Sequence, residues 1–381
     1  MNKSRPEVTS VPTDFSGGPR ASGSRSTRIG TIVRLGHNER TIPLPETAVR
    51  EMLELIRPED LTALPELGPL YEKMSRHFEV TTDQLIICHG SDAGIGDLFR
   101  AFVGAGDQVV QPHPTYHRYI EFCEIAGAEP VLVGYDPTDY HFRCADVHES
   151  IRPGTKLVVI VNPGSPTGLP VTIECIDRVA TQARRHGALI LVDEAYHHYC
   201  DVSAIPLLSK HPNLVVARTF SKAWGIAGLR VGAILSDSAV IAGLRKIKPR
   251  HEISSVSARI TEYLLDHPSI MREYVLEVER ARPLVAETLR GLGYAAIPGS
   301  SASMLVRVPD FINPNSLKEA LASEGYEVAA GLPEPFQQHM RVGIGPWVQM
   351  EGFLSALADV TRRLDDHDQH DVKPAAVVQP E

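Results

Sequence analysis

Short apolar runs alternate along the middle of this chain with segments whose apolar residues recur at helical spacing. The runs at 156–161 and 188–192 are almost continuously apolar, which is typical of strands covered on both faces of a sheet. Residues 173–186 carry apolar residues at helical spacing, and Gly187 can cap that helix. The alternation predicts an α/β domain with a mainly parallel sheet sandwiched by helices. The runs that predict its strands are 85–88, 108–110, 130–133, 156–161, 188–192, 214–216 and 231–235.

The pattern changes after about residue 249, where a long helical stretch at 271–292 includes Pro283. Proline removes a helical hydrogen bond, so a kink is expected there. Strands at 304–308 and 341–344, with helices near 317–324 and 352–364, predict a smaller α+β domain.

The two ends of the chain have few large apolar residues and are expected to be disordered. No internal repeat is visible. The predicted organisation is a disordered segment at 1–28, an N-terminal arm at 29–50 that joins the small domain, a large domain at 51–255, a small domain at 256–364 and a disordered tail at 365–381.

Composition removes several classes of function. The 381 residues can form two domains, and the net charge of −9 does not suit a nucleic-acid binder. There is no apolar run long enough to span a membrane and no apolar core of a signal peptide, so a cytoplasmic protein is expected. The five cysteines are dispersed without a CxxC pair, which argues against a disulfide framework and a zinc site.

Polar motifs directly follow three of the apolar runs. They begin at Asn162, at Asp193 and at Arg218, and the last one contains Lys222. Ligands bind where parallel strands end, so these side chains are expected to meet. Lys222 offers an amine for a Schiff base and Asp193 a carboxylate for a pyridinium nitrogen, while Asn162 and Tyr196 can bind a ring hydroxyl. Together they predict pyridoxal 5′-phosphate as the cofactor.

Further residues complete this predicted cofactor site. Gly90-Ser91-Asp92 opens a predicted helix, whose free N–H groups suit a phosphate. Thr219, Ser221 and Arg230 add hydroxyl and cationic groups, and Tyr116 can stack on the ring. The structural alternatives are a solvated lysine, a helix-capping aspartate, a turn asparagine and a core tyrosine.

Two other features concern substrate and metal. Arg341 lies in an apolar segment of the small domain, where its planar fork suits a carboxylate and an ordinary buried ion pair is the alternative. His197 and His198 are adjacent, but no carboxylate or cysteine set accompanies them. No metal site is predicted.

From about residue 34 to residue 364, the chain resembles the fold-type I pyridoxal-phosphate enzymes, in particular class I/II aminotransferases of the histidinol-phosphate aminotransferase type. The resemblance implies an aminotransferase for amino acids and 2-oxo acids, a homodimer with active sites at the subunit interface, and Asn38 and Arg341 as substrate-binding residues. It rests on Asn38-Glu39, Gly90-Ser91-Asp92, Pro114-Thr115-Tyr116, Asn162-Pro163, Pro166-Thr167-Gly168, Asp193-Glu194-Ala195-Tyr196, Ser221-Lys222, Gly228-Leu229-Arg230 and Arg341-Val342.

The chain departs from that family at three places around the predicted active site. A Tyr-Pro pair of the family is replaced by Leu64-Pro65, and a phosphate-binding arginine is missing from 325–330, which includes Ala329 and Ala330. The segment 248–252 carries charge where the family has aromatic and amide residues. Histidinol phosphate is therefore not the expected substrate.

Two other functions stay open. A decarboxylase similar to threonine-phosphate decarboxylases would use the same cofactor to break the bond to the carboxylate. A cofactor-binding sensor domain of a transcription regulator would need a DNA-binding module, and the roughly thirty residues before the fold lack helical periodicity.

Overall fold

The computed structural model describes residues 32–297 and 299–371, which form two compact units. The segment 1–28 and the end of the tail, both expected to be disordered, lie outside the described residues. The first unit comprises Ile42–Leu276 and residues 299–302, and the second comprises residues 32–41, Glu277–Ile297 and residues 303–371.

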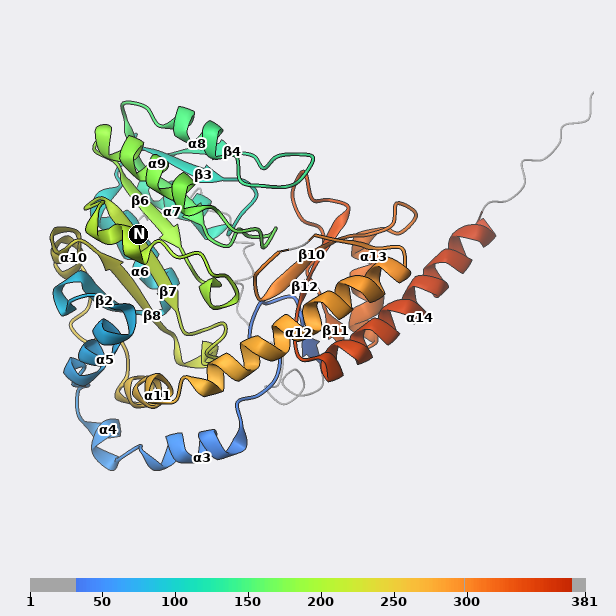
Figure 1. Cartoon of the computed structure of the whole chain (residues 1–381), viewed down its shortest axis with the longest axis horizontal. Coiled ribbons are helices and arrows are strands. Elements are labelled where there is room, and N and C mark those ends of the chain that lie inside the picture. The colour runs from blue at the N-terminus through green and yellow to red at the C-terminus, as the bar shows by residue number, and fades with distance from the viewer. Residues whose placement is uncertain (1–31, 298, 372–381) are drawn as a thin grey trace, which may run out of the picture. The chain divides into compact units, whose positions relative to one another are not determined.

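A seven-stranded sheet organises the first unit, in the order β2-β8-β7-β6-β5-β3-β4 (Figure 1). Strand β8 is antiparallel to both neighbours, and every other adjacent pair is parallel. Strand β2 therefore runs in the same direction as β7. The predicted mainly parallel sheet is confirmed. Its strands are β2 (Leu85–His89), β3 (Gln108–Pro112), β4 (Glu129–Val133), β5 (Thr155–Val161), β6 (Leu189–Asp193), β7 (Leu214–Thr219) and β8 (Val231–Ser236).

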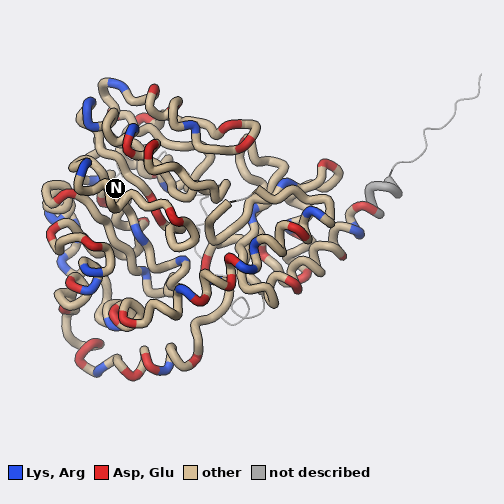
Figure 2. Tube along the Cα trace, viewed as in Figure 1, with Lys and Arg blue, Asp and Glu red and all other residues tan. Residues whose placement is uncertain are grey.

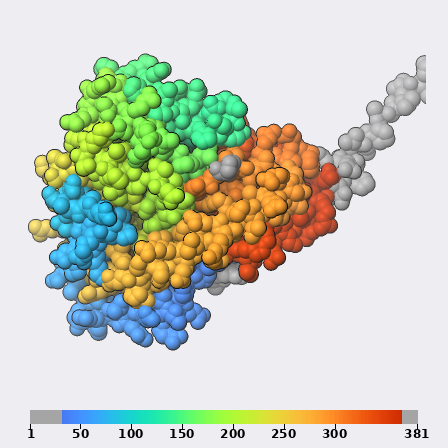
Figure 3. All heavy atoms as spheres, in the orientation of Figure 1, coloured from blue at the N-terminus to red at the C-terminus, as the bar shows by residue number. Residues whose placement is uncertain are grey.

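Helices cover both faces of this sheet, as the apolar strands require. On one face, buried residues of α6, α7 and α10 pack with Leu157, Val159 and Leu191. The alternate strand residues Val158 and Ile190 are also buried, and α9 contacts β5 and β6. In the space-filling view, side chains form a continuous surface over this part of the first unit (Figure 3).

The first unit contains the following helices and short 3₁₀ turns, several of which carry side chains of the site described below. They are α3 (Glu46–Glu54), α4 (Pro58–Thr62), α5 (Gly68–Phe78), α6 (Gly90–Phe102), α7 (Arg118–Ala126), α8 (Cys144–Ser150), α9 (Ile173–Arg185), α10 (Ser238–Arg245), α11 (Ser255–Asp266), η1 (Thr82–Gln84), η2 (His197–Tyr199), η3 (Ile205–Ser209) and η4 (Ala227–Leu229). The first residues of α12 (Ser269–Gly291) also belong to it.

The second unit is built on a three-stranded antiparallel sheet in the order β12-β10-β9. A separate parallel pair joins β1 to β11. Helix α12 includes Pro283 within its span, and α14 continues to Asp371, so residues 365–371 are helical rather than disordered. The elements are β1 (Val33–Arg34), β9 (Ala295–Ala296), β10 (Ser303–Arg307), α13 (Pro314–Ser323), β11 (Tyr326–Glu327), β12 (His339–Gly343) and α14 (Trp347–Asp371).

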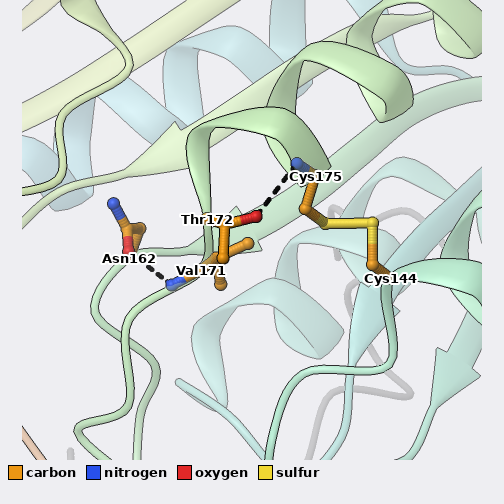
Figure 4. The surroundings of a disulfide bond; sticks show 5 residues. All are labelled: Cys144, Asn162, Val171, Thr172 and Cys175. Carbon is orange, nitrogen blue, oxygen red and sulfur yellow. Dashed lines mark hydrogen bonds between the residues drawn. A yellow bond between two sulfur atoms is a disulfide. The ribbon is translucent and has the colours of Figure 1, made fainter.

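One disulfide joins Cys144 to Cys175, although the dispersed cysteines argued against a disulfide framework (Figure 4). The two cysteines are 31 residues apart in sequence. Cys144 is the first residue of α8 and Cys175 lies in the first turn of α9, and these two helices contact each other. Their Cα atoms are 5.9 Å apart, which suits a disulfide. No local spacing motif could reveal a pair brought together only by helix packing.

The distributions of charged and apolar residues do not change this description of the fold. Basic and acidic residues are interspersed along the described chain (Figure 2). Across residues 32–297 and 299–371, the structure contains no helix of the length and apolar character needed to cross a membrane.

Candidate active site

One edge of the seven-stranded sheet collects the polar motifs. Strands β2, β5, β6 and β7 end at this edge, because they run in the same direction. Asp193 is the last residue of β6, Asn162 follows β5, and Lys222 lies three residues after β7. The antiparallel β8 begins at the same edge, which places Arg230 there, and Gly90 follows β2. The sheet topology thus gathers side chains that are up to 140 residues apart in sequence.

Asp193 is held by hydrogen bonds on both carboxylate oxygens. Tyr119 Oη donates to Asp193 Oδ2 at 2.5 Å, and the Ala195 N–H donates to Oδ1 at 3.1 Å. The residue is only 6% exposed. Burial raises the pKa of Asp193, and the hydrogen bonds from Tyr119 and Ala195 oppose that rise. The result is an oriented, buried carboxylate at the end of a strand.

Asn162 is fully buried and its amide is fixed by the backbone (Figure 4). Its Oδ1 accepts from the Val171 N–H at 2.9 Å, and its Nδ2 donates to the Val202 carbonyl at 3.1 Å. An amide nitrogen carries two hydrogens, so a second donation from Nδ2 is possible. Asn162 therefore serves the local fold and can also reach a ligand.

Lys222 lies near Tyr196 on a loop that buried apolar residues anchor. Its Nζ is 5.6 Å from the centroid of the Tyr196 ring. Phe220 and Trp224 on either side of it are buried, with ring centroids 5.4 Å apart. This packing holds the half-buried lysine at the strand end instead of leaving it in solvent.

A compact cradle surrounds the first turn of α6. Arg230 Nη1 donates to Ser221 Oγ at 3.2 Å. Gly90 has a φ of +75°, and a Cβ added there would lie 2.5 Å from Arg230 Nη2. A Cβ on Gly232 would lie 2.3 Å from the Ser91 backbone nitrogen. Only glycine permits this approach, which sets a guanidinium against a helix N-terminus and suits a phosphate.

Thr219 and the pair Asp92–Tyr116 support this cradle. Thr219 Oγ1 accepts from the Ser221 N–H at 3.1 Å and so fixes the turn. Tyr116 Oη donates to Asp92 Oδ1 at 3.2 Å, and Arg118 Nε lies 3.6 Å from the same oxygen. Asp92 therefore orients an aromatic side chain instead of facing the phosphate cradle with unpaired negative charge.

Asn38 and Arg341 lie in the second unit. Arg341 is in β12, and its Nη2 donates to the Gly36 carbonyl at 2.9 Å. Asn38 is 4% exposed and has a φ of 54°. Arg341 also pairs through its backbone with Ala329, in an isolated antiparallel bridge. Ala329, one of the positions that depart from the family, thus lies beside Arg341.

The charged segment after α10 is engaged within the first unit. Tyr71 Oη donates to Glu252 Oε1 at 2.5 Å, and Lys248 Nζ donates to Tyr71 Oη at 3.0 Å. Lys248 also forms an ion pair with Glu252. Burial lowers the pKa of Lys248 to about 8. Lys248 and Glu252 also line a cavity of about 200 Å³ with Cys88 and Asp97, and the ion pair between them compensates their charges.

Sequence reasoning assigned no role to three residues of this edge, Tyr119, Glu194 and Arg218. Tyr119 bonds Asp193 across 74 residues, and Arg218 forms an ion pair with Glu194. Glu194 and Arg218 lie within the polar motifs that follow the apolar runs, and this position is only a weak indication that they belong to the site. Tyr119 lies three residues after Tyr116, but no spacing rule connects it to an aspartate in another strand.

Comparison with known proteins decides the family. A model for "Aminotransferase class I and II" matches residues 32–357. The chain belongs to the class I and II aminotransferases. A histidinol-phosphate aminotransferase of Caldanaerobacter subterraneus subsp. tengcongensis is 31% identical over 297 residues, which cover 77% of this chain and 82% of that protein. Histidinol-phosphate aminotransferase 3 of Mesorhizobium japonicum is 27% identical over 87% of this chain and 89% of its own.

Solved structures share the fold of this aminotransferase. The histidinol-phosphate aminotransferase of Sinorhizobium meliloti in complex with pyridoxal-5′-phosphate superposes with a TM-score of 0.84 at 23% identity, covering 96% of this chain and 99% of that one. The aspartate aminotransferase of Thermus thermophilus with maleate gives a TM-score of 0.74 at 21% identity, with coverages of 88% and 92%.

The predictions of an aminotransferase and of pyridoxal phosphate are confirmed. This aminotransferase takes amino-acid and oxo-acid substrates, as its family does. The residues at the sheet edge fit the cofactor, because the glycine-backed cradle suits a phosphate and the buried Asp193 suits a protonated ring nitrogen.

Proposed function

We propose that this aminotransferase exchanges an amino group between an α-amino acid and a 2-oxo acid, and that histidinol phosphate is not its natural substrate. The observation that carries the proposal is the backbone pairing of Ala329 with Arg341. The family arginine that binds a substrate phosphate is expected in this segment, and alanine has no donor to replace it.

The sheet-edge residues are assigned the following work. When bound, pyridoxal phosphate supplies an electron sink for the substrate α-carbon. Lys222 moves a proton between that carbon and C4′ of the cofactor, and Asp193 keeps the ring nitrogen protonated. Asn162 and Tyr196 bind the ring hydroxyl, and Tyr116 covers the ring face. The phosphate is held by Gly90, Ser91, Thr219, Ser221 and Arg230, and Asp92 contributes only its backbone N–H in the first turn of α6.

Arg341 and Asn38 are assigned to the substrate carboxylate. The bond from Arg341 Nη2 to the Gly36 carbonyl restrains the guanidinium, so that its planar fork can bind two carboxylate oxygens. This role follows from the family resemblance and from the position of Arg341 on a strand of the second unit.

Local charge also disfavours a substrate phosphate near Ala329. Glu327, two residues earlier, lies on the same side of an extended segment and pairs with His37, with 2.8 Å between Oε1 and Nε2. Both side chains are more than 40% exposed. A carboxylate at this place repels a phosphate dianion, whereas an arginine would attract it.

We also infer a homodimer that acts in the cytoplasm. Large apolar side chains lie exposed on and after α3 and α4, at Leu53 (62%), Leu61 (70%) and Leu64 (72%). A second subunit would bury such a patch.

A half-reaction screen tests the substrate proposal. The cofactor-loaded enzyme is mixed with single amino acids or with histidinol phosphate, and the change in cofactor absorbance is followed. Histidinol phosphate should react about tenfold to a hundredfold less efficiently than the best amino acid, since one charge-assisted hydrogen bond is missing. More efficient turnover of histidinol phosphate than of any amino acid would refute the proposal.

Gain-of-function variants sharpen the test. Ala329→Arg and Ala330→Arg face opposite sides of an extended segment, so one of them should raise kcat/KM for histidinol phosphate. Val348→Arg is the matched control, because it adds the same charge at a residue that is 83% exposed in the same unit. Borohydride reduction should separately fix the cofactor on the peptide that contains Lys222.

A further inference from the structure

Tyr119 is a buried tyrosine on α7 whose hydroxyl is committed to one carboxylate. The residue is 0% exposed, and its Oη lies 2.5 Å from Asp193 Oδ2. The edge of the Tyr116 ring packs against it, with centroids 5.9 Å apart and planes at 88°. Two residues that are three positions apart thus serve the same cofactor ring. Tyr116 is assigned to the face of the ring, and Tyr119 bonds Asp193, the carboxylate assigned to the ring nitrogen.

The two hydrogen bonds on Asp193 fix the direction of its carboxylate. Tyr119 holds Oδ2 and the Ala195 N–H holds Oδ1, so the carboxylate cannot rotate without losing one of them. Each carboxylate oxygen has two lone-pair sites. One site on each oxygen is used internally, and another can accept the N–H of the pyridine ring.

The charges around Asp193 make this hydroxyl necessary. Burial and the nearby Asp92 raise the pKa of Asp193, while Tyr119, the Ala195 N–H and the positive Lys222 lower it. Burial also raises the pKa of Tyr119 well above its ordinary value, and the charge of Asp193 adds to that rise. Tyr119 therefore stays protonated and donates its hydrogen throughout the working pH range.

We propose that Tyr119 is a positioning residue that orients Asp193 toward the pyridine nitrogen and keeps this carboxylate ionised. The proposal rests on the cofactor assignment made above. It adds a residue that does not itself touch the cofactor and acts through Asp193.

The variant Tyr119→Phe removes only the hydroxyl. Asp193 then becomes more basic and draws the proton away from the ring nitrogen, so the ring withdraws electrons less strongly. The Lys222 nitrogen that is bonded to the cofactor should consequently keep its proton to higher pH. The pH midpoint of the absorption change of the bound cofactor should rise by about one unit, and kcat/KM should fall about tenfold to a hundredfold.

Tyr294→Phe is the matched control. Tyr294 is 2% exposed and shares one hydrogen bond, of 2.8 Å, with Thr361 Oγ1 in the second unit. Loss of that hydroxyl should lower thermal stability to a similar extent without moving the pH midpoint. An unchanged midpoint in Tyr119→Phe, with activity equal to that of Tyr294→Phe, would overturn the proposal.

A double-mutant cycle gives an independent readout through the dissociation constant of the cofactor. Tyr119→Phe should weaken cofactor binding in the wild-type background and have a smaller effect beside Asp193→Asn, because the carboxylate through which it acts is gone. Equal effects in both backgrounds would also refute the positioning role. Borohydride labelling away from Lys222 would instead reject the cofactor assignment itself, so the two failures are distinguishable.

Discussion

Arg218 and Glu194 form an ion pair inside the first unit, with 2.5 Å between Nη2 and Oε2. Their side chains are 5% and 0% exposed. Ser203 Oγ bridges them, since it accepts from Arg218 at 2.8 Å and donates to Glu194 at 3.1 Å. Glu194 follows Asp193 and Arg218 precedes Thr219, so the pair ties together the ends of two strands that carry the site.

Breaking that pair should strongly destabilise the protein. Glu194→Gln leaves the Arg218 charge buried without its counter-charge, which costs about 3–5 kcal/mol of unfolding free energy. Urea denaturation measures the loss. Asp310→Asn is the control, because its pair with Arg307 is exposed and should be worth less than about 1 kcal/mol. Equal effects of the two variants would contradict the expectation.

Asp193→Asn should keep the cofactor and lose most of the activity. Asparagine has nearly the same shape but cannot stabilise a protonated ring nitrogen, and loss of such a group costs about 10²–10³ in kcat or more. Steady-state kinetics and the cofactor absorbance are measured on one preparation. Asp177→Asn, which removes a carboxylate paired with the exposed Lys210 and the buried His211, should leave kcat unchanged. Near-normal turnover by Asp193→Asn would show that another group serves the ring nitrogen.

Arg341→Lys should raise KM for amino acids and oxo acids about tenfold to a hundredfold. Lysine keeps the charge but loses the planar fork that binds two oxygens, and a charge-assisted hydrogen bond is lost. The absorbance of the bound cofactor should not change. Arg307→Lys is an exposed control in the same unit. Wild-type kcat/KM in Arg341→Lys would make Arg341 a structural residue only.

Acid should destabilise the second unit through His339. This residue is 1% exposed, and burial lowers its pKa to about 4, with a smaller contribution from Arg307. The unfolded chain binds a proton below about pH 6.5, whereas the native state does so only near pH 4. The contribution of His339 to the free energy of unfolding is therefore complete above pH 6.5, falls by roughly 1.4 kcal/mol per pH unit between pH 6.5 and 4, and changes no further below pH 4.

His339→Gln removes this titration and should flatten the pH dependence of unfolding between pH 6.5 and 4. His141→Gln, at a side chain that is 57% exposed, is the control and should not flatten it. The same slope in His339→Gln and the wild type would refute the assignment.

Reduction of the disulfide should lower stability by roughly 3–4 kcal/mol, the value expected when a loop of about thirty residues is released in the unfolded chain. Unfolding is compared with and without dithiothreitol. Cys144→Ser should match the reduced protein and be insensitive to the reductant. Cys200→Ser should behave as the wild type, because Cys200 is a free cysteine. Insensitivity of the wild type would mean that the bond contributes nothing.

Much of the fold could be predicted because its signals are local. A strand such as β5 is apolar on both faces, and polar residues such as Asn162 and Asp193 follow directly where parallel strands end. Contacts between residues that are far apart in the chain have no comparable local signal in the sequence. The bond from Tyr119 to Asp193 and the disulfide from Cys144 to Cys175 depend on how helices pack on the sheet.

The charged segment after α10 shows the same limit. The sequence shows that the charge of segment 248–252 is unusual for the family, but not which residues that charge pairs with. The structure pairs Glu252 with Tyr71 and Lys248, so the unusual residues compensate one another. Composition reveals that a segment is atypical, but only the fold reveals what its charges face.

The left-handed backbone of Arg230 links the stability of this protein to the binding of its cofactor. A φ of 54° costs a non-glycine residue about 1–3 kcal/mol, and here the strain brings a guanidinium against the first turn of α6. A phosphate that binds only the folded form offsets that cost. Free cofactor at a hundred times its dissociation constant adds about 2.7 kcal/mol to stability. The cofactor-free protein should therefore open more often and be cut faster by a protease than the cofactor-loaded protein.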